Sequence, residues 1–144
     1  MSDPPAPTID GQQGFLQCVP YARAVSGVEL YGDAWSWWEA AAGRYERGTT
    51  PLPGAVLVMK RDGPLTRGHV AVVTDVVGPR EIRVTHANWG YAGKQRGQVE
   101  HDVPIIDVST KNDWSAVRVW NGSSYGRINA AHGFIYPRRA PQAI

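Results

Sequence analysis

The sequence predicts an α+β domain, because segments with helical periodicity come first along the chain and short, apolar, β-branched segments follow them. Before Thr50, apolar side chains recur at spacings of three and four, whereas later apolar segments are brief and separated by Pro and Gly. A chain of 144 residues is expected to form one domain. We assign residues 1–13 to a disordered, Pro-rich lead-in, 14–137 to the domain and 138–144 to a tail.

Two helices are predicted in the first third of the chain. The first runs from Cys18 to about Val25, because Pro20 suits a first helical turn and Gly27 suits the left-handed cap after the last turn. The second runs over 34–47, where one buried stripe is expected and Trp37 lies off that stripe, free to face outward. The stripe consists of Trp35, Trp38, Ala41, Ala42 and Tyr45.

Six strands are predicted after the helices. They cover residues 55–60, 69–77, 81–89, 99–103, 116–120 and 133–136. The turn at 78–80 contains Gly and Pro, so the second and third of these strands are expected to form a hairpin. We therefore expect the two helices to pack on a curved antiparallel sheet.

Composition excludes several classes of protein. The net charge of +2 is only mildly basic and no long Lys/Arg run is present, so we expect no nucleic-acid partner. A negatively charged partner such as a bacterial cell wall suits this charge. One cysteine excludes an intrachain disulfide, no Cys/His spacing resembles a zinc site, and no apolar run approaches the roughly 20 residues of a membrane span. We expect a monomer that uses no metal and no organic cofactor.

Cys18 is the only cysteine, and it stands at the predicted start of the first helix. There the helix dipole and the N–H groups of the first turn favour a thiolate, and cysteines so placed have pKa values of roughly 3.5–7.5 instead of about 8.5. The alternative is that Cys18 is a small buried apolar residue, as most unpaired cysteines are. This stretch alone leaves both interpretations open.

Two histidines and an asparagine lie on the predicted hairpin. His69 begins its first strand directly after Gly68, which lets another backbone or a substrate approach. On the second strand, alternation places His86 and Asn88 on one face, at its polar end. An even hairpin loop puts His69 on that same face, and an odd loop without a bulge puts it on the other. A histidine at a strand end is also often a surface residue.

A cysteine at a helix start, with a histidine and an asparagine on adjacent strands, is the arrangement of cysteine amidases and peptidases built on the papain plan. In such a site Cys18 attacks the amide carbon, His69 protonates the leaving amine, and a third group holds the ring of His69. The backbone N–H of Cys18 is expected to stabilise the oxyanion. The side chains of Gln12 and Gln17 are further candidates for that role, and a purely structural role for either is the alternative.

Five short blocks of the sequence are also informative through their order and spacing. They are Gln17-Cys18-Val19-Pro20-Tyr21, Gly32-Asp33-Ala34-Trp35 with Trp37-Trp38, Pro53-Gly54-Ala55-Val56-Leu57, Gly68-His69-Val70-Ala71-Val72-Val73 and Gly133-Phe134-Ile135. In order and spacing they resemble the CHAP domain, the cysteine, histidine-dependent amidohydrolase/peptidase family of the NlpC/P60-like branch. The likeness spans residues 14–136.

The resemblance implies a papain-like fold with N-terminal helices packed on a curved antiparallel sheet. It also implies that Cys18 is the nucleophile and His69 the base. Members of the family commonly cleave peptidoglycan, as N-acetylmuramoyl-L-alanine amidases or as endopeptidases on the stem peptide or cross-bridge. Peptidoglycan or another peptide amide is therefore the expected substrate, cleaved through a thioester intermediate.

The sequence departs from the family pattern at the third catalytic position. Members often carry a Glu just after the histidine strand and an Asn two residues later, and here those positions hold His86 and Asn88. His86 accepts a hydrogen bond only when neutral, and near pH about 6.5 a second imidazolium would repel the protonated His69. We therefore predict that Asn88 orients His69 and that His86 lines the substrate cleft. The alternatives are that His86 is the third member, or that activity is weaker.

Two other functions stay open, an amidase acting on a small peptide conjugate such as glutathionylspermidine and a catalytically weak or silent wall-binding module. The resemblance implies work outside the cytoplasm, secreted or in the cell envelope, yet residues 1–13 contain no export signal. We expect either a signal upstream in the natural gene or delivery by a secretion system or by lysis. A cytoplasmic location is the alternative.

Overall fold

The computed structural model of the chain describes residues 17–87, 89 and 98–139. The helices in these ranges are α1 (Cys18–Ser26), the 3-10 helix η1 (Ala34–Ser36) and α2 (Trp37–Ala40). The strands are β1 (Tyr45–Gly48), β2 (Val56–Met59), β3 (His69–Gly78), β4 (Glu81–Ala87), β5 (Val99–Asp107), β6 (Ala116–Val119) and β7 (Asn129–Arg139). The predicted lead-in at 1–13 lies outside the described residues, as do residues 140–144 of the predicted tail.

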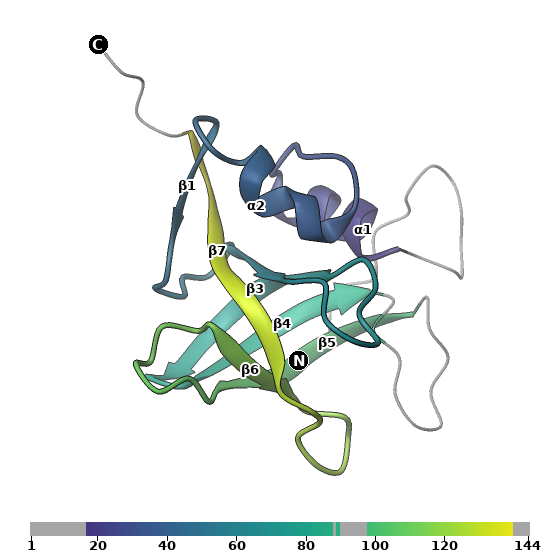
Figure 1. Cartoon of the computed structure of the whole chain (residues 1–144), viewed down its shortest axis with the longest axis vertical. Helices are drawn as coiled ribbons and strands as arrows, with labels where there is room; N and C mark the ends of the chain where they lie inside the picture. Colours follow the sequence, from purple (N-terminus) through teal and green to yellow (C-terminus); the bar gives the residue numbers. More distant parts are fainter. Residues whose placement is uncertain (1–16, 88, 90–97, 140–144) are drawn as a thin grey trace.

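The strands form a closed barrel (Figure 1). The sheet order is β1-β7-β2-β3-β4-β5-β6, and an additional β7–β6 pairing joins the two ends of the six-stranded part. The length of β7 permits this closure, because its first residues pair with β6 and its last residues pair with β1 along the same edge. β1 is therefore an extra edge strand attached to a six-stranded antiparallel barrel.

The predicted α+β, papain-like class with N-terminal helices on a curved sheet is wrong. Among the described residues, 46% are in strands and only 14% in helices. The main reason lies at 34–47, where one long helix was predicted. Helical structure ends at Ala40, Gly43 adopts a left-handed φ of 75°, and Tyr45–Gly48 becomes β1. A left-handed residue cannot continue a right-handed helix, so the apolar spacing across Gly43 did not report helical structure.

The first predicted helix is confirmed, and so are the positions of the six predicted strands. Helix α1 ends before Gly27, whose φ is 78° and whose N–H donates to the carbonyl of Arg23 at 3.0 Å. β5 and β7 are longer than predicted. Local sequence signals therefore located most elements, and the closure of the sheet is the feature that they did not predict.

Alternation along β2 and β3 separates two apolar layers. In β2, Leu57 and Met59 face the barrel interior, whereas Val56 and Val58 face the helices. Trp37 is 0% exposed in this outer layer, so the interpretation that it is free to face outward is wrong. Figure 1 shows both α-helices on the same side of the barrel. The outer layer thus joins the short helices to β2 and β3.

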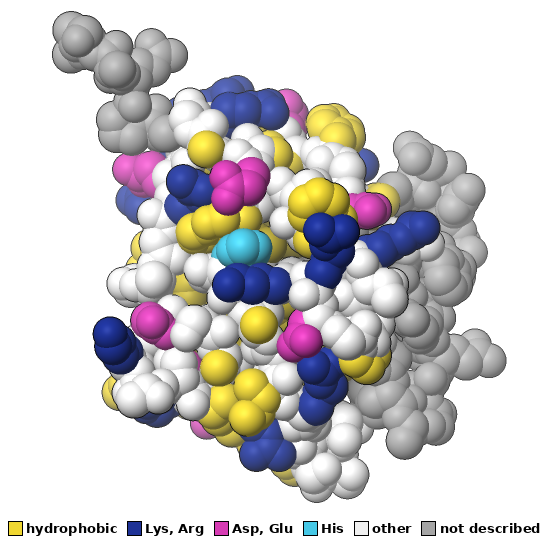
Figure 2. Space-filling model, in the orientation of Figure 1, with side chains coloured by type: hydrophobic (Ala, Val, Ile, Leu, Met, Phe, Trp, Pro, Cys, Tyr) yellow, Lys and Arg dark blue, Asp and Glu magenta, His cyan; other side chains and the backbone are white. Residues whose placement is uncertain are grey.

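Charged side chains of both signs are mixed with apolar ones on the face in Figure 2. This mixture agrees with the small net charge of +2. Among the helices that the structure describes, none combines the length and the apolar character needed to cross a membrane.

Candidate active site

Cys18 is the first residue of α1, and the residue before it, Gln17, has the extended backbone of an N-cap. The helix is fixed to the barrel by Tyr21, whose hydroxyl lies 2.8 Å from Oγ1 of Thr85 on β4. Burial raises the pKa of Tyr21 and outweighs the opposite effect of the Thr85 hydroxyl, so the phenol stays protonated near neutral pH. Cys18 is therefore held at a helix N-terminus, where dipole and N–H groups favour the thiolate.

His69 is the first residue of β3 and is 2% exposed. Gly68 before it has a left-handed φ of 70°, and a Cβ at this position would lie 2.6 Å from the Met59 carbonyl oxygen and 2.9 Å from the Trp35 nitrogen. The Trp35 N–H donates to the carbonyl of Arg67 at 3.0 Å. The predicted close approach of backbone at Gly68 is confirmed. It lets η1 and β2 pack tightly against the start of β3 and so sets the position of His69.

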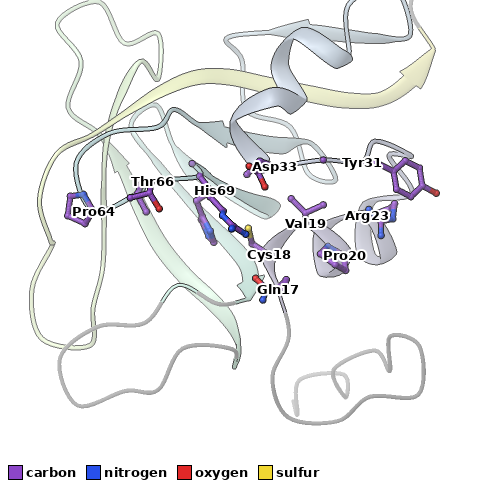
Figure 3. A pocket seen from close by; sticks show the side chains of 15 residues that line it. Gln17, Cys18, Val19, Pro20, Arg23, Tyr31, Asp33, Pro64, Thr66 and His69 are labelled. Carbon is purple, nitrogen blue, oxygen red and sulfur yellow. The ribbon is translucent and has the colours of Figure 1, made fainter.

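Cys18 and His69 line the same cleft, which we call the α1 cleft (Figure 3). It has a volume of about 730 Å³ and lies between α1, the segment 31–34 and the loop 64–68. Figure 3 shows the two side chains reaching toward one another, Cys18 from α1 and His69 from β3. Arg23, Asp33 and Arg67 also line the cleft, so it carries charges of both signs.

His86 contacts His69 on the barrel side. Nδ1 of His86 lies 3.0 Å from Nε2 of His69, and the two rings meet edge to face with centroids 4.9 Å apart. The side chain of His86 is 0% exposed. Trp89 packs on both rings, with its centroid 4.7 Å from that of His69 and 5.8 Å from that of His86. The histidine pair is thus enclosed, with one ring edge of His69 turned to His86.

The predicted site residues are only partly covered by the structure. Cys18, Gln17 and His69 line one cleft, and His86 is hydrogen-bonded to His69. Asn88 lies outside the described residues, so its role in orienting His69 stays a prediction. Gln12, the other candidate for the oxyanion, lies outside them as well.

Sequence reasoning missed Glu100 on β5. Its Oε1 lies 3.5 Å from Nε2 of His86. The sequence does show an acidic residue within the predicted strand 99–103. Which residue of β4 it faces, however, depends on the register of the β4–β5 pairing. The pairing shifts between Val84 and His86, which brings Glu100 opposite His86.

These side chains offer nucleophilic attack by a thiolate that stands next to a histidine. The ring of that histidine is itself held by a hydrogen bond to His86. Within the ranges 17–87, 89 and 98–139, no group of three or more His, Cys, Asp or Glu side chains is arranged to hold a metal ion.

Comparison with protein families gives a match, whereas comparison with curated proteins does not. The family model described as CHAP domain matches residues 8–88 of the 144, which is more than half of the chain. The matched part includes α1, β3 and β4, and therefore Cys18, His69 and His86. The chain belongs to the CHAP domain family, whose members are in general cysteine- and histidine-dependent amidohydrolases or peptidases.

Proposed function

We propose that this protein hydrolyses amide bonds of peptidoglycan, with Cys18 as nucleophile and His69 as its base. For the residue that orients His69 we adopt the alternative, His86, in place of the predicted Asn88, because His86 contacts His69 directly. The observation that carries this proposal is the α1 cleft, in which Cys18 at a helix N-terminus and His69 at a strand start face one another. The 3.0 Å contact between Nε2 of His69 and Nδ1 of His86 supports the choice of His86 as third member. Membership of the CHAP domain family supports the same chemistry.

The contact with His86 supports an assignment of roles to the two nitrogens of His69. Nε2 faces His86 at 3.0 Å, which leaves Nδ1 as the nitrogen that exchanges a proton with Cys18. A histidine that accepts a proton at Nδ1 must carry its own hydrogen on Nε2, so Nε2–H donates to Nδ1 of His86. The same hydrogen bond persists in the imidazolium, and the ring keeps its orientation through the reaction.

The reaction follows from these roles. The thiolate of Cys18 attacks the amide carbon, and the carbonyl oxygen becomes an oxyanion. The tetrahedral intermediate collapses to a thioester as the C–N bond breaks and His69 gives its Nδ1 proton to the leaving amine. Neutral His69 then takes a proton from a water molecule that attacks the thioester, and the carboxylic acid and the thiolate are released.

The start of α1 is suited to stabilise the oxyanion. Pro20 has no N–H, and the N–H of Tyr21 donates to the carbonyl of Gln17 at 3.2 Å. The N–H groups of Cys18 and Val19 therefore stand at the positive end of the helix, next to the attacking sulfur. We assign the oxyanion to the backbone N–H of Cys18.

The charges of the α1 cleft suit a peptide substrate. Arg23 donates to the carbonyl of Leu30 at 3.1 Å and its guanidinium stacks on Tyr31 at 4.2 Å, so the cation is held in place at the wall of the cleft. Asp33 adds the opposite charge. Stem peptides of peptidoglycan carry free carboxylates and amines, which these two side chains can pair with.

Digestion of purified sacculi tests this function. We expect the wild-type protein to release new termini that mass spectrometry detects, and Cys18→Ala to release none. Stem peptides with a new N-terminal alanine indicate an amidase, and new termini within the stem or cross-bridge indicate an endopeptidase. If sacculi of several chemotypes stay intact while soluble peptide conjugates are cleaved, the substrate is a small amide instead.

Thiol reactivity separates a weak enzyme from a silent wall-binding module. A catalytic thiolate reacts rapidly with iodoacetamide near neutral pH, and an inert thiol hardly reacts. We expect rapid alkylation at Cys18 in the wild type and slower alkylation in His69→Ala, because the thiolate then loses its imidazolium partner. Slow alkylation of the wild type, together with intact sacculi, contradicts the hydrolase proposal.

A further inference from the structure

Two titratable side chains reach His86 from neighbouring strands. Its Nδ1 lies 3.0 Å from Nε2 of His69 on β3, and its Nε2 lies 3.5 Å from Oε1 of Glu100 on β5. Nε2 of His86 is buried and has no hydrogen-bond partner in the described part of the chain, so the second contact is an ion-pair distance without hydrogen-bond alignment. Glu100 therefore acts on His86 mainly through its charge.

These two contacts decide which nitrogen of His86 carries the proton. If His69 serves as base through Nδ1, its Nε2–H must donate, and Nδ1 of His86 must accept without a proton of its own. The proton of neutral His86 then sits on Nε2, on the side where the carboxylate of Glu100 lies. A negative charge at that distance favours a proton on the nearer nitrogen.

Building on the proposed function, we propose that Glu100 is a positioning residue. Its carboxylate keeps the proton of His86 on Nε2, and so keeps Nδ1 of His86 available as the acceptor for His69. The same negative charge favours the imidazolium of His69, which the thiolate form of Cys18 requires. The site is thus a chain of four side chains in which a carboxylate acts on the base through an intervening imidazole.

The backbone around Glu100 is fixed to the rest of the site. Oγ1 of Thr85 donates to the carbonyl of Glu100 at 3.2 Å, next to the shift in the β4–β5 pairing. The hydroxyl of Tyr21 contacts the same Oγ1 at 2.8 Å. One threonine thereby connects the helix that carries Cys18 with the strand that carries Glu100.

Among the described residues, further ionisable groups near the histidine pair lie on different sides of it. Asp33 and Arg67 line the α1 cleft, on the side of Cys18. His101 follows Glu100 on β5, and its Nδ1 lies 3.0 Å from Thr85 Oγ1, which faces α1 instead of the barrel interior. Glu100 is the carboxylate that the structure places against His86.

The test compares Glu100→Gln with Asp102→Asn in the full chain. Glutamine keeps the shape of Glu100 and removes its charge. Asp102 is an exposed carboxylate on the same strand, and asparagine tolerates its backbone φ of 54°, so this control removes an equal charge away from His86. The tautomer of His86 is measured by long-range 1H–15N correlation of the imidazoles, which is tractable with four histidines.

We expect His86 to be protonated on Nε2 in the wild type and in Asp102→Asn, and to become a mixture of tautomers in Glu100→Gln. The same variant is expected to lose roughly 10–100-fold in kcat with KM little changed, as for other residues that orient a functional histidine. Glu100→Asp keeps the charge and is expected to retain more activity than Glu100→Gln. The alkaline limb of the kcat/KM profile should move to lower pH in Glu100→Gln, because the imidazolium of His69 loses a stabilising charge.

An unchanged His86 tautomer with an unchanged pH profile in Glu100→Gln overturns the positioning role, whatever the stability of the variant. Failure of the hydrolase proposal gives a different result, a wild-type protein inert toward sacculi and iodoacetamide. In that case the spectra alone decide: a proton on Nε2 of His86 that Glu100→Gln redistributes supports the inference, and an unaffected tautomer overturns it.

Discussion

His86 and Asp107 are both buried ionisable side chains of the barrel, 1% and 3% exposed, but they lie at opposite ends of the β4–β5 ladder. His86 is near the last residue of β4, beside the α1 cleft. Asp107 lies by the start of β4, where its N–H donates to the carbonyl of Arg80 at 2.9 Å. The two ends of one strand pair thus hold two buried polar groups in different surroundings.

The carboxylate of Asp107 is surrounded by donors. It accepts from the backbone N–H of Ser109 at 2.8 Å, from Nδ2 of Asn112 at 2.6 Å and from the N–H of Trp114 at 3.4 Å, and Arg80 lies 3.6 Å away. Burial by itself would raise the pKa of Asp107, but the hydrogen bonds from Ser109 and Asn112 outweigh it and hold the pKa below its ordinary value. This carboxylate therefore has a structural role, because it holds the segment 109–114 at the end of β5.

His86 has a different balance of contacts. One nitrogen is hydrogen-bonded to His69, and the other is buried beside the carboxylate of Glu100 without a hydrogen bond among the described residues. Buried polar groups with every partner present stabilise a fold, whereas an incompletely satisfied one costs stability and calls for another explanation. Of these two buried groups, the incompletely satisfied His86 is therefore the one at which chemistry is expected.

The largest effect is expected from His86→Leu. This change removes the acceptor for His69 and should lower kcat/KM by about 10²–10⁴-fold. The free energy of unfolding should fall by about 1–3 kcal/mol, less than for Asp107→Ala, because Nε2–H of the buried His69 loses Nδ1 of His86 as its acceptor. His86→Asn is the matched variant, since its amide oxygen can approach the place of Nδ1, and it should recover part of the activity. Full activity of His86→Leu would contradict the assignment of the third member.

Asp107→Ala should show the reverse pattern. It leaves several buried donors without an acceptor, so urea unfolding should give a loss of about 3–5 kcal/mol. The activity of the molecules that remain folded should stay within about twofold of the wild type, because Asp107 is at the other end of the ladder. Asp75→Ala, at an exposed position of β3, is the control and should change stability by no more than about 0.5 kcal/mol. A large loss of kcat in Asp107→Ala would break the distinction between the two ends.

We also expect Asp107 to account for a large part of the loss of stability at low pH. Its folded pKa is lowered, so the unfolded chain binds the proton first as the pH falls, and its contribution to stability is lost below the ordinary carboxyl pKa. Between pH 7 and pH 3, the free energy of unfolding measured with urea should therefore fall more steeply for the wild type than for Asp107→Asn. Hydrogen bonds from Ser115 also lower the pKa of Asp113, so part of the acid loss should remain in the variant. Parallel curves for the two proteins would contradict this role.

Local signals explain how much of the fold the sequence predicted. Pro20 and Gly27 delimit α1 through positions that few other residues fit, and β-branched runs locate the strands. Closure of the barrel depends on β6 meeting β7, a pairing that neither strand encodes locally. The helical spacing across Gly43 gave a wrong prediction because a long-range pairing is again decisive. Tyr45–Gly48 forms a strand because it pairs with the edge of β7.

The site residues that local sequence marks could be predicted, whereas the one that depends on long-range strand pairing could not. Cys18 and His69 stand at the ends of elements, and the local sequence blocks that resemble the CHAP domain singled them out. The partner of His69 could be narrowed to His86 or Asn88, since both lie on one face of one predicted strand. Glu100 could not be found, because a one-residue shift in the β4–β5 pairing decides which side chain of β5 meets His86.

The smallest effect is expected at Asn112, which supplies one of the donors to Asp107. Its φ of 53° is left-handed, so alanine would add backbone strain to the loss of the side chain, and glycine is the cleaner replacement. Asn112→Gly removes the bond to Asp107 and the bond to the carbonyl of Pro79, yet leaves Asp107 other donors. We expect a loss of about 1–2 kcal/mol in urea unfolding, less than for Asp107→Ala, and no change in kcat/KM. A loss as large as that of Asp107→Ala would mean that the donors do not share the carboxylate, and that the structure at this end of the ladder depends on the hydrogen bonds of Asn112 alone.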